Sequence, residues 1–474
     1  MGEVIKPDLC VIGAGSGGLS VAAAAASFGV PVVLVERDRM GGDCLNYGCV
    51  PSKALIAAAK RAAPRQGAVL GISTGRPMVD FARVHDHVHG VIAAIAPMDS
   101  KERFGGLGVR VIQGEARFKS RSAITVGSDI EIRARRFVIA TGSSPAVPPI
   151  PGLGEVTYYT NETIFGLTEC PTHLIIIGCG PIGMELAQAY RRLGAAVTVI
   201  EAAQPLAKDD EECAAIVIGE LQRDGVVLRT GAEVVRVEPA DTKVRVVIMA
   251  DAHEEAIEGT HLLIATGRRP NGEGLNLAAA GIKHEGNRIV VDNRLTTSNK
   301  KVFAIGDAAS AQQFTHLANY HAGIVIRRAL FRLPARVNED VVPRVTYTDP
   351  ELSHVGLTEA EARKRNLKFR VLRASYHDND RAQTARETRG HLKALVSPNG
   401  RILGATIVGA HAGELISAWT LAIQQRLKIR AFVDLIVPYP TLSEISKRAA
   451  IGFYLPSLTS PWLRRIIALL RRFG

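Results

Sequence analysis

A strand, glycine-rich turn, helix and second strand follow one another twice in the sequence, and this β-α-β pattern constrains the fold more than any other feature. The defining positions of the first copy are Leu9–Ile12, Gly13, Gly15, Gly18 and Glu36. A Gly-x-Gly-x-x-Gly turn after a strand and before a helix, with an acid about twenty residues further on, is typical of dinucleotide-binding units. The glycines let backbone N–H groups approach a pyrophosphate, and Glu36 is expected to accept hydrogen bonds from a ribose.

The second copy of the pattern lies near the middle of the chain. Its defining positions are Leu174–Ile177, Gly178, Gly180, Gly183 and Glu201. Two such units predict two different bound dinucleotides, and the length of 474 residues predicts several domains. The composition, 47% hydrophobic and 22% charged, fits a globular enzyme rather than a disordered chain.

Two closely spaced cysteines, Cys44 and Cys49, follow the first unit. Pro51 fits the first turn of a helix that comes after them, where its missing N–H costs nothing. The positive end of that helix is expected to point at Cys49 and to lower the pKa of its thiol, and Lys53 adds a cation one turn further on. The pair is therefore predicted to act as a nucleophile and electron carrier. The alternative, two small buried residues, is the usual meaning of such a spacing taken alone.

The thirteen residues Gly41–Lys53 resemble the redox-active disulfide signature of the flavoprotein disulfide reductases, the class I pyridine nucleotide-disulfide oxidoreductases. The likeness covers roughly residues 5–450 and is greatest to mercuric reductase-like and dihydrolipoamide dehydrogenase-like proteins. It implies an α/β fold with two Rossmann-like dinucleotide-binding domains, one for FAD and one for NAD(P), and a C-terminal α+β dimerisation domain. The implied boundaries are 1–150 with 271–340 for the FAD-binding domain, 151–270 for the NAD(P)-binding domain, 341–455 for the dimerisation domain and 456–474 for an amphipathic tail.

The same resemblance implies which residues hold the two cofactors, with Asp307 expected to hydrogen-bond the ribityl chain of FAD. The implied FAD contacts are Gly13, Gly15, Gly18, Glu36, Gly42, Lys53, Thr141, Gly142, Gly306, Asp307 and Ala318, and the implied nicotinamide nucleotide contacts are Gly178, Gly180, Gly183, Glu201 and Gly267. Alanines, with no arginine close by, follow Glu201, which favours the free 2′-hydroxyl of NADH over the 2′-phosphate of NADPH. NADPH stays the alternative.

By this resemblance, electrons are expected to pass from NAD(P)H through the flavin to a Cys44–Cys49 disulfide and on to an acceptor. Cys49 is the sulfur expected to face the flavin, and Cys44 is the one expected to attack the substrate. Glu185 matches the glutamate that pairs with Lys53, and a carboxylate there would keep the lysine charged. The alternative for Glu185 is an ordinary surface position on a helix.

The C-terminal motif departs from most of the family. Relatives that reduce disulfides carry a histidine base at the position of Tyr439, whereas Glu444, which would orient that base, is retained. Both residues are expected to reach the active site of the partner subunit in a homodimer. A histidine with a pKa of about 6.5 exchanges protons with a thiol at neutral pH, but a tyrosine with a pKa of about 10 is a poor base. Turnover of dithiols such as dihydrolipoamide is therefore expected to suffer.

Mercuric reductase is similar at this motif, because it also has tyrosine there. That family normally ends in a vicinal cysteine pair, however, and residues 214–474 contain no cysteine. The acceptor is predicted to be a metal ion or thiol-bound substrate, as for mercuric-reductase-like proteins. Two alternatives stay open. One is a dihydrolipoamide dehydrogenase-type oxidoreductase acting on a small-molecule disulfide, and the other is a non-catalytic flavin- and NADH-sensing module docked to a membrane partner.

Other features of the sequence concern partners and location. The net charge of +12 comes with no nucleic-acid-binding motif, and no apolar run reaches the about 18–20 residues of a membrane span. The N-terminus does not resemble a signal peptide, so a cytoplasmic protein is expected. His85 and His89 share a helix face, but no metal site is predicted, because no acid or cysteine ligand is assured nearby.

Residues 461–473 are predicted to form an amphipathic cationic helix. At about 100° per residue, the apolar and the basic side chains fall on opposite sides. The apolar side holds Trp462, Leu463, Ile466, Ile467, Leu469, Leu470 and Phe473, and the basic side holds Arg464, Arg465, Arg471 and Arg472. Such a helix is too short to span a bilayer but suits peripheral contact with the inner face of a membrane. Packing on the enzyme's own dimer interface is the alternative of equal weight.

Overall fold

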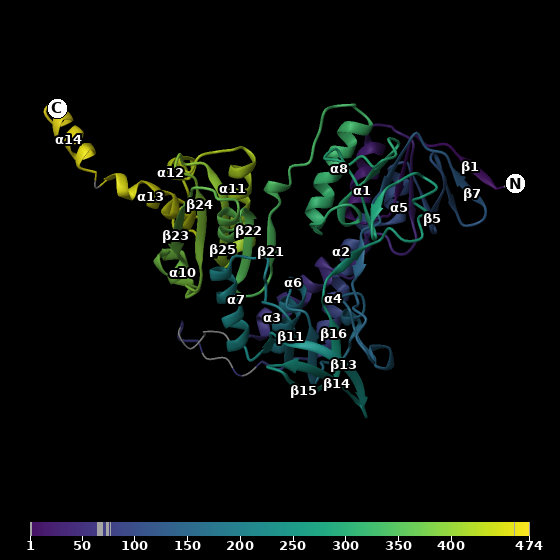
Figure 1. Ribbon diagram of the computed structural model, residues 1–474, viewed down its shortest axis with the longest axis horizontal. Coiled ribbons are helices and arrows are strands. Elements are labelled where there is room, and N and C mark those ends of the chain that lie inside the picture. The colour runs from purple at the N-terminus through teal and green to yellow at the C-terminus, as the bar shows by residue number, and fades with distance from the viewer. Residues whose placement is uncertain (1, 64–69, 73–74, 76, 459, 474) are drawn as a thin grey trace.

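Figure 1 shows the computed structural model, which describes residues 2–63, 70–72, 75, 77–458 and 460–473. Two nucleotide-binding units lie next to a C-terminal sheet domain, and the C-terminal helix projects beyond that domain. Among the described residues, none of the helices has both the length and the apolar character that crossing a membrane requires. The predicted class, α/β with two dinucleotide-binding units and a C-terminal α+β domain, is confirmed.

The first β-α-β unit lies in a parallel sheet with the strand order β20-β8-β2-β3-β4. Its strands are β2 (Leu9–Ile12), β3 (Val32–Glu36), β4 (Val109–Gln113), β8 (Arg136–Ile139) and β20 (Val302–Ala304). Helices α1 (Ser16–Ser27) and α8 (Thr315–Ala329) pack together on one face. The other face is covered by a sheet of β1 (Glu3–Ile5), β7 (Ile130–Ile132), β6 (Ala123–Val126) and β5 (Ala116–Ser120). Both faces of the parallel sheet are therefore buried, as expected for parallel strands.

The second unit lies in a parallel sheet with the order β12-β11-β10-β16. Its strands are β10 (His173–Ile177), β11 (Ala196–Glu201), β12 (Val227–Thr230) and β16 (His261–Ile264), and an antiparallel sheet of β13 (Glu233–Ala240), β14 (Lys243–Ala250) and β15 (His253–Gly259) covers one face. Helix α6 (Pro181–Arg192) covers the other face. Helix α3 (Cys49–Ala62), which begins at the second cysteine, packs against α6, so the cysteine segment joins the two units.

The C-terminal domain is built on an antiparallel sheet with the order β21-β22-β25-β24-β23. Its strands are β21 (Arg344–Thr346), β22 (Glu351–Gly356), β23 (Arg370–Ser375), β24 (His391–Val396) and β25 (Ile402–Gly409). Its helices are α9 (Glu359–Lys364), α10 (Asp380–Ala385), α11 (Ala412–Gln424), α12 (Arg430–Asp434) and α13 (Glu444–Leu458), and α14 (Pro461–Leu470) follows them. Trp419 of α11 is fully buried and stacks on Phe432 at the centre of this core.

The remaining helices and strands lie between or beside these sheets. They are α2 (Gly42–Asn46), α4 (Phe81–Ile95), α5 (Lys101–Gly106), α7 (Glu211–Arg223), β9 (Ser143–Pro145), β17 (Arg268–Pro270), β18 (His284–Glu285) and β19 (Arg288–Ile289). Strands β9 and β17 pair with each other, and they link the end of the first unit to the end of the second. Helix α7 contacts the C-terminal sheet, so the second unit also adjoins that domain.

Candidate active site

The glycine-rich turn of the first unit is shaped to admit a phosphate group. A Cβ at Gly18 would come within 1.9 Å of the Gly13 carbonyl oxygen, so a side chain there would push α1 away from the turn. A Cβ at Gly15 would meet no atom within 4 Å, so this position faces open space at the N-terminus of α1. The unsatisfied N–H groups and the dipole of a helix N-terminus favour an anion there. The turn therefore fits the pyrophosphate of a dinucleotide.

An acidic side chain closes each of the two units in the same way. Glu36 accepts hydrogen bonds from the backbone N–H groups of Ala14, at 2.6 Å, and Asp38, at 2.8 Å. Glu201 accepts one from Cys179, at 2.8 Å, and another from the residue two positions after itself, at 3.0 Å. The two carboxylates are thereby held at the strand ends, where the ribose of a bound nucleotide lies in units of this kind.

A cavity of about 1930 Å³ runs between the two units and brings most of the predicted site residues together. Those that line it are Gly13, Gly15, Glu36, Gly42, Cys44, Cys49, Lys53, Thr141, Gly142, Gly178, Gly180, Glu185, Glu201, Gly267, Gly306, Asp307 and Ala318. Gly18 and Gly183 lie beneath the two turns and do not line it. Tyr439 and Glu444 do not line it either.

The two cysteines line this cavity where α2 meets α3, and both are free thiols. Cys49 is the first residue of α3, and its sulfur lies 3.4 Å from the Thr315 hydroxyl. A hydrogen bond from Cys44 lowers the pKa of Cys49 to about 6; Thr315 and the charge of Lys53 act in the same direction, against burial. The same thiol pair raises the pKa of Cys44. The lowered pKa was predicted from the helix end, but its main cause is the neighbouring thiol.

Lys53 projects one turn into α3 and is held by the second unit. Its Nζ lies 2.7 Å from an oxygen of Glu185, which is buried on α6 rather than exposed on its surface. The other oxygen of Glu185 accepts the backbone N–H of Tyr347 at 2.9 Å, and the Tyr347 ring lies 4.5 Å from the ammonium. Burial lowers the pKa of Lys53, but the charge and hydrogen bond of Glu185 outweigh it, so the net pKa is raised. The lysine therefore stays charged at neutral pH.

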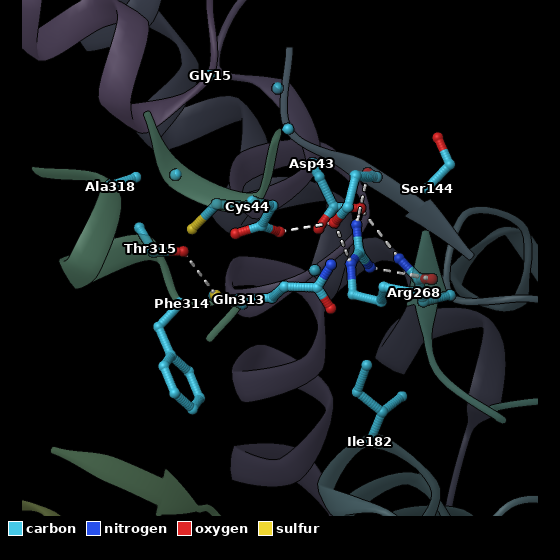
Figure 2. A pocket seen from close by; sticks show the side chains of 18 of the residues that line it. Gly15, Asp43, Cys44, Ser144, Ile182, Arg268, Gln313, Phe314, Thr315 and Ala318 are labelled. Carbon is cyan, nitrogen blue, oxygen red and sulfur yellow. Dashed lines mark hydrogen bonds and ion pairs between the residues drawn. The ribbon is translucent and has the colours of Figure 1, made fainter. Parts of the chain in front are cut away.

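A polar network that the sequence did not predict surrounds the first cysteine. Asp43 forms an ion pair of 3.0 Å with Arg268 (Figure 2). It also accepts a hydrogen bond of 3.1 Å from Asn161. Arg268 also donates to Ser143 at 2.8 Å, and the Ser143 hydroxyl donates to Asp307 at 2.6 Å. Asp43 lies within the cysteine segment Gly41–Lys53, and Arg268 directly follows Gly267, but no local spacing indicates that the two pair. The network ties the cysteine loop to the end of the second unit.

The C-terminal motif lies apart from this cavity within one chain. Tyr439 is 71% exposed, and its hydroxyl donates to Asp380 at 3.0 Å. This hydrogen bond raises the pKa of Tyr439 further from neutrality. One carboxylate oxygen of Glu444 is buried, and no hydrogen-bond partner for it is found in the described part of the chain.

The histidines of α4 do not form a ligand set. The rings of His85 and His89 lie 4.2 Å apart, and Nε2 of His89 contacts the Phe165 carbonyl oxygen at 3.1 Å. Within the residues that the structure describes, no group of three or more histidine, cysteine, aspartate or glutamate side chains is arranged to hold a metal ion.

Two family descriptions match the chain. Residues 7–323 match the pyridine nucleotide-disulphide oxidoreductases, and residues 342–450 match the dimerisation domain of the same family. The chain therefore belongs to the pyridine nucleotide-disulphide oxidoreductases, as the resemblance implied. This family depends on FAD together with a pyridine nucleotide, and the second match supports a homodimer.

Relatives of two kinds match almost the whole chain. Mercuric reductase from Streptomyces lividans is 32% identical over 94% of this chain and 96% of its own length, and dihydrolipoyl dehydrogenase from Geobacillus stearothermophilus is 33% identical over the same shares. A solved structure, the Cu(II) complex of the HOCl-induced flavoprotein disulfide reductase RclA from Escherichia coli, superposes with a TM-score of 0.85 at 29% identity, covering 96% of this chain and 100% of that one. These similarities define the class of enzyme without selecting a substrate.

Proposed function

We propose that the chain is an FAD-dependent NAD(P)H oxidoreductase that passes electrons to a redox-active Cys44–Cys49 pair and then to a metal ion or thiol-bound substrate of the mercuric reductase type. One observation carries this proposal: two thiols of unequal acidity line the cavity that joins two dinucleotide-binding units. The similarity to mercuric reductases over 94% of the chain supports the acceptor class.

The residues of the first unit fit FAD. The open position at Gly15 leaves room for the pyrophosphate, and Glu36 would accept hydrogen bonds from the ribose. Asp307, which accepts the Ser143 hydrogen bond, would meet the ribityl hydroxyls. The charged Lys53 would complement negative charge on the flavin ring. When bound, FAD supplies the two-electron relay between the nicotinamide and the cysteines.

We propose NADH as the favoured donor, with NADPH as the alternative. The Glu201 carboxylate lies at the ribose end of the second unit, where it would accept a hydrogen bond from a 2′-hydroxyl and repel a 2′-phosphate. The ratio of kcat/KM for the two donors tests this proposal directly. Glu201→Ala is expected to bring the kcat/KM values for NADH and NADPH closer together. A wild-type preference for NADPH would contradict the proposal that NADH is the donor.

The two thiols have separate proposed roles. Cys49 keeps a thiolate at neutral pH, because its pKa is lowered to about 6, and it is the sulfur that would face the flavin. Cys44 keeps its proton to higher pH and would attack the acceptor after losing that proton. Oxidation of one thiolate and one thiol to a disulfide releases two electrons and one proton. One mercuric ion, or two cupric ions, would therefore be reduced for each NADH oxidised.

Tyr439 and Glu444 are proposed to complete the site of the partner subunit in a homodimer. Both lie outside the cavity of their own chain, and the buried carboxylate oxygen of Glu444 has no partner among the described residues. A tyrosine is a poor proton carrier at neutral pH. Reduction of a thiolate-bound metal ion needs electrons and ligand exchange more than proton transfer, so this substitution favours a metal acceptor over a disulfide.

The test is NADH consumption by the purified, FAD-loaded protein with lipoamide, with mercuric ion buffered by excess thiol, and with chelated cupric ion. Each acceptor is also offered to Tyr439→His. We expect metal-ion turnover by the wild type. In the variant we expect lipoamide turnover to rise by about a hundredfold or more, because general acid–base catalysis contributes about 10²- to 10⁴-fold.

Two other outcomes would change the assignment. Lipoamide turnover by the wild type without metal-ion turnover would establish the dihydrolipoamide dehydrogenase type. This type is the second candidate because Glu444 is retained and because the chain is similar to dihydrolipoyl dehydrogenase. If no acceptor is reduced while NADH still reduces the flavin, the acceptor is neither a metal ion of this kind nor lipoamide. That result would favour a sensing module.

A further inference from the structure

Helix α14 and the turn after it, residues 461–473, are attached to the rest of the chain without packing against its cores. None of its described side chains is buried, and none belongs to a hydrophobic core. Figure 1 shows α14 projecting beyond α13 at the edge of the C-terminal domain. The exposed fractions of Trp462, Leu470 and Phe473 are 70%, 60% and 79%. A soluble surface rarely leaves aromatic and aliphatic side chains together in water unless they contact a partner.

The charged side chains of the same segment are all basic. Residues 461–473 contain four arginines, Arg464, Arg465, Arg471 and Arg472, and no acidic residue. None of the four forms an ion pair with another described residue, whereas arginines elsewhere commonly do, as Arg236 does with Glu238 at 2.7 Å. Within α14, the direction midway between Arg464 and Arg465 lies about 180° from the centre of the apolar side, at about 100° per residue. Both faces of the helix are therefore available for one partner.

We infer that α14 docks on an anionic lipid surface and lies parallel to it. A helix of ten residues is about 15 Å long, half the thickness of a hydrocarbon core, so it cannot cross the bilayer. With its apolar face in the acyl boundary, the arginines reach the headgroup level, where their guanidinium groups pair with phosphates. A lipid surface satisfies both faces at once.

A second copy of this chain fits the same helix less well. It would have to offer an apolar groove beside a row of carboxylates, and the chain as a whole carries a net charge of +12. An anionic membrane offers both features over an unlimited area. The inference is independent of the redox reaction, because no residue of α14 lines the cavity between the two nucleotide-binding units.

The test is sedimentation of the full-length, FAD-loaded protein with mixed phosphatidylglycerol and phosphatidylcholine vesicles, beside vesicles of phosphatidylcholine alone. We expect binding to the mixed vesicles only, weakening as salt rises, because exposed charges are screened. Arg464→Gln/Arg465→Gln is expected to weaken binding about 25-fold, since each arginine near an anionic surface contributes about fivefold. The control, Arg294→Gln/Arg365→Gln, removes the same charge from exposed positions elsewhere and is expected to leave binding nearly unchanged.

Tryptophan fluorescence adds a second readout. Trp419 is fully buried and Trp462 is exposed, so a blue shift of emission on adding mixed vesicles would report burial of α14 itself. Protein that stays in the supernatant with mixed vesicles, or binding that the α14 variant does not weaken, would overturn the inference. If the wild type does not bind vesicles and Arg464→Gln/Arg465→Gln changes the oligomeric state, α14 instead contacts a second copy of this chain. NADH-dependent reduction of the flavin in solution is unchanged in every case.

Discussion

The cysteine pocket and the C-terminal motif are both expected parts of one active site, but a single chain completes only the first. Around Cys49 the neighbours are in place, with the Thr315 hydroxyl at 3.4 Å and the Lys53–Glu185 pair at 2.7 Å. Tyr439, by contrast, is mostly exposed and hydrogen-bonds Asp380 of its own domain. The groups around the two cysteines are therefore assembled within one chain. In the proposed homodimer, Tyr439 and Glu444 would complete the site of the partner subunit.

The largest expected effect comes from a change in the cysteine pocket. Cys49→Ser removes the low-pKa thiol, and turnover with any acceptor is expected to fall more than about a thousandfold, as when a nucleophile is removed. Flavin content and reduction of the flavin by NADH should persist, because neither needs the sulfur. The measurement is steady-state NADH consumption together with anaerobic flavin reduction. Cys170→Ser, a half-buried thiol outside the cavity, is the matched control and should keep full activity.

Hybrid dimers test whether the C-terminal motif acts in the site of the partner subunit. Cys44→Ser and Glu444→Ala are each expected to lower turnover by about a hundredfold or more as pure dimers. If each site combines cysteines from one chain with Glu444 from the other, a hybrid dimer keeps one intact site and recovers about half of the wild-type activity. The assay uses differently tagged chains that are co-expressed and purified through both tags. Hybrids that are as inactive as either parent would show that the cysteines and Glu444 of each site come from one chain.

The Lys53–Glu185 pair tests how the cysteine pocket is tuned. Lys53→Met is expected to slow flavin reduction by NADH about a hundredfold, and Glu185→Gln about tenfold, because a fixed charge beside the site is lost or weakened. Stopped-flow absorbance of the flavin measures both rates. Lys60→Met, on the same helix and half-exposed, is the control and should react at the wild-type rate. Equal rates in all variants would make the pair purely structural.

The smallest effect is a shift in a pH profile. Alkylation of Cys49 follows its thiolate, so the wild-type rate should rise as pH increases through about 6 and then level off. Thr315→Val removes a hydrogen bond that lowers this pKa, so the midpoint should move about one unit higher. Thr315→Ser, which keeps the hydroxyl, should leave the midpoint in place. The measurement is the rate of alkylation by iodoacetamide as a function of pH. All variants keep Cys44, because replacing it would itself change the pKa of Cys49.

Local sequence patterns predicted the elements that carry the site. The strand expected at Leu9–Ile12 is β2, and the strand expected at Leu174–Ile177 is β10 with one further residue at its start. The helix expected after the cysteines begins at Cys49 itself. These predictions succeed because apolar strands, glycine turns and helix starts depend on neighbouring residues, within about a turn of the chain.

Partners from distant segments were not predictable in the same way. The pairing of Asp43 with Arg268, the contact of Thr315 with Cys49 and the position of Tyr347 beside Lys53 each join segments far apart in the sequence. No spacing along the chain encodes them. They arise only when the two parallel sheets and the C-terminal sheet pack around the cysteine helix.

The sequence by itself determined the kind of chemistry that this protein can perform, because the glycine turns, the acids that close them and the paired cysteines are local features with local physical causes. Only the tertiary structure decided which groups from distant segments surround the two thiols. The lowered pKa of Cys49 depends on Cys44, Lys53 and Thr315, and Thr315, the first residue of α8, is the one that comes from a distant segment. It also decided that Tyr439 lies outside its own cavity. Electrostatic environment is set by distance in space, and folding alone sets that distance.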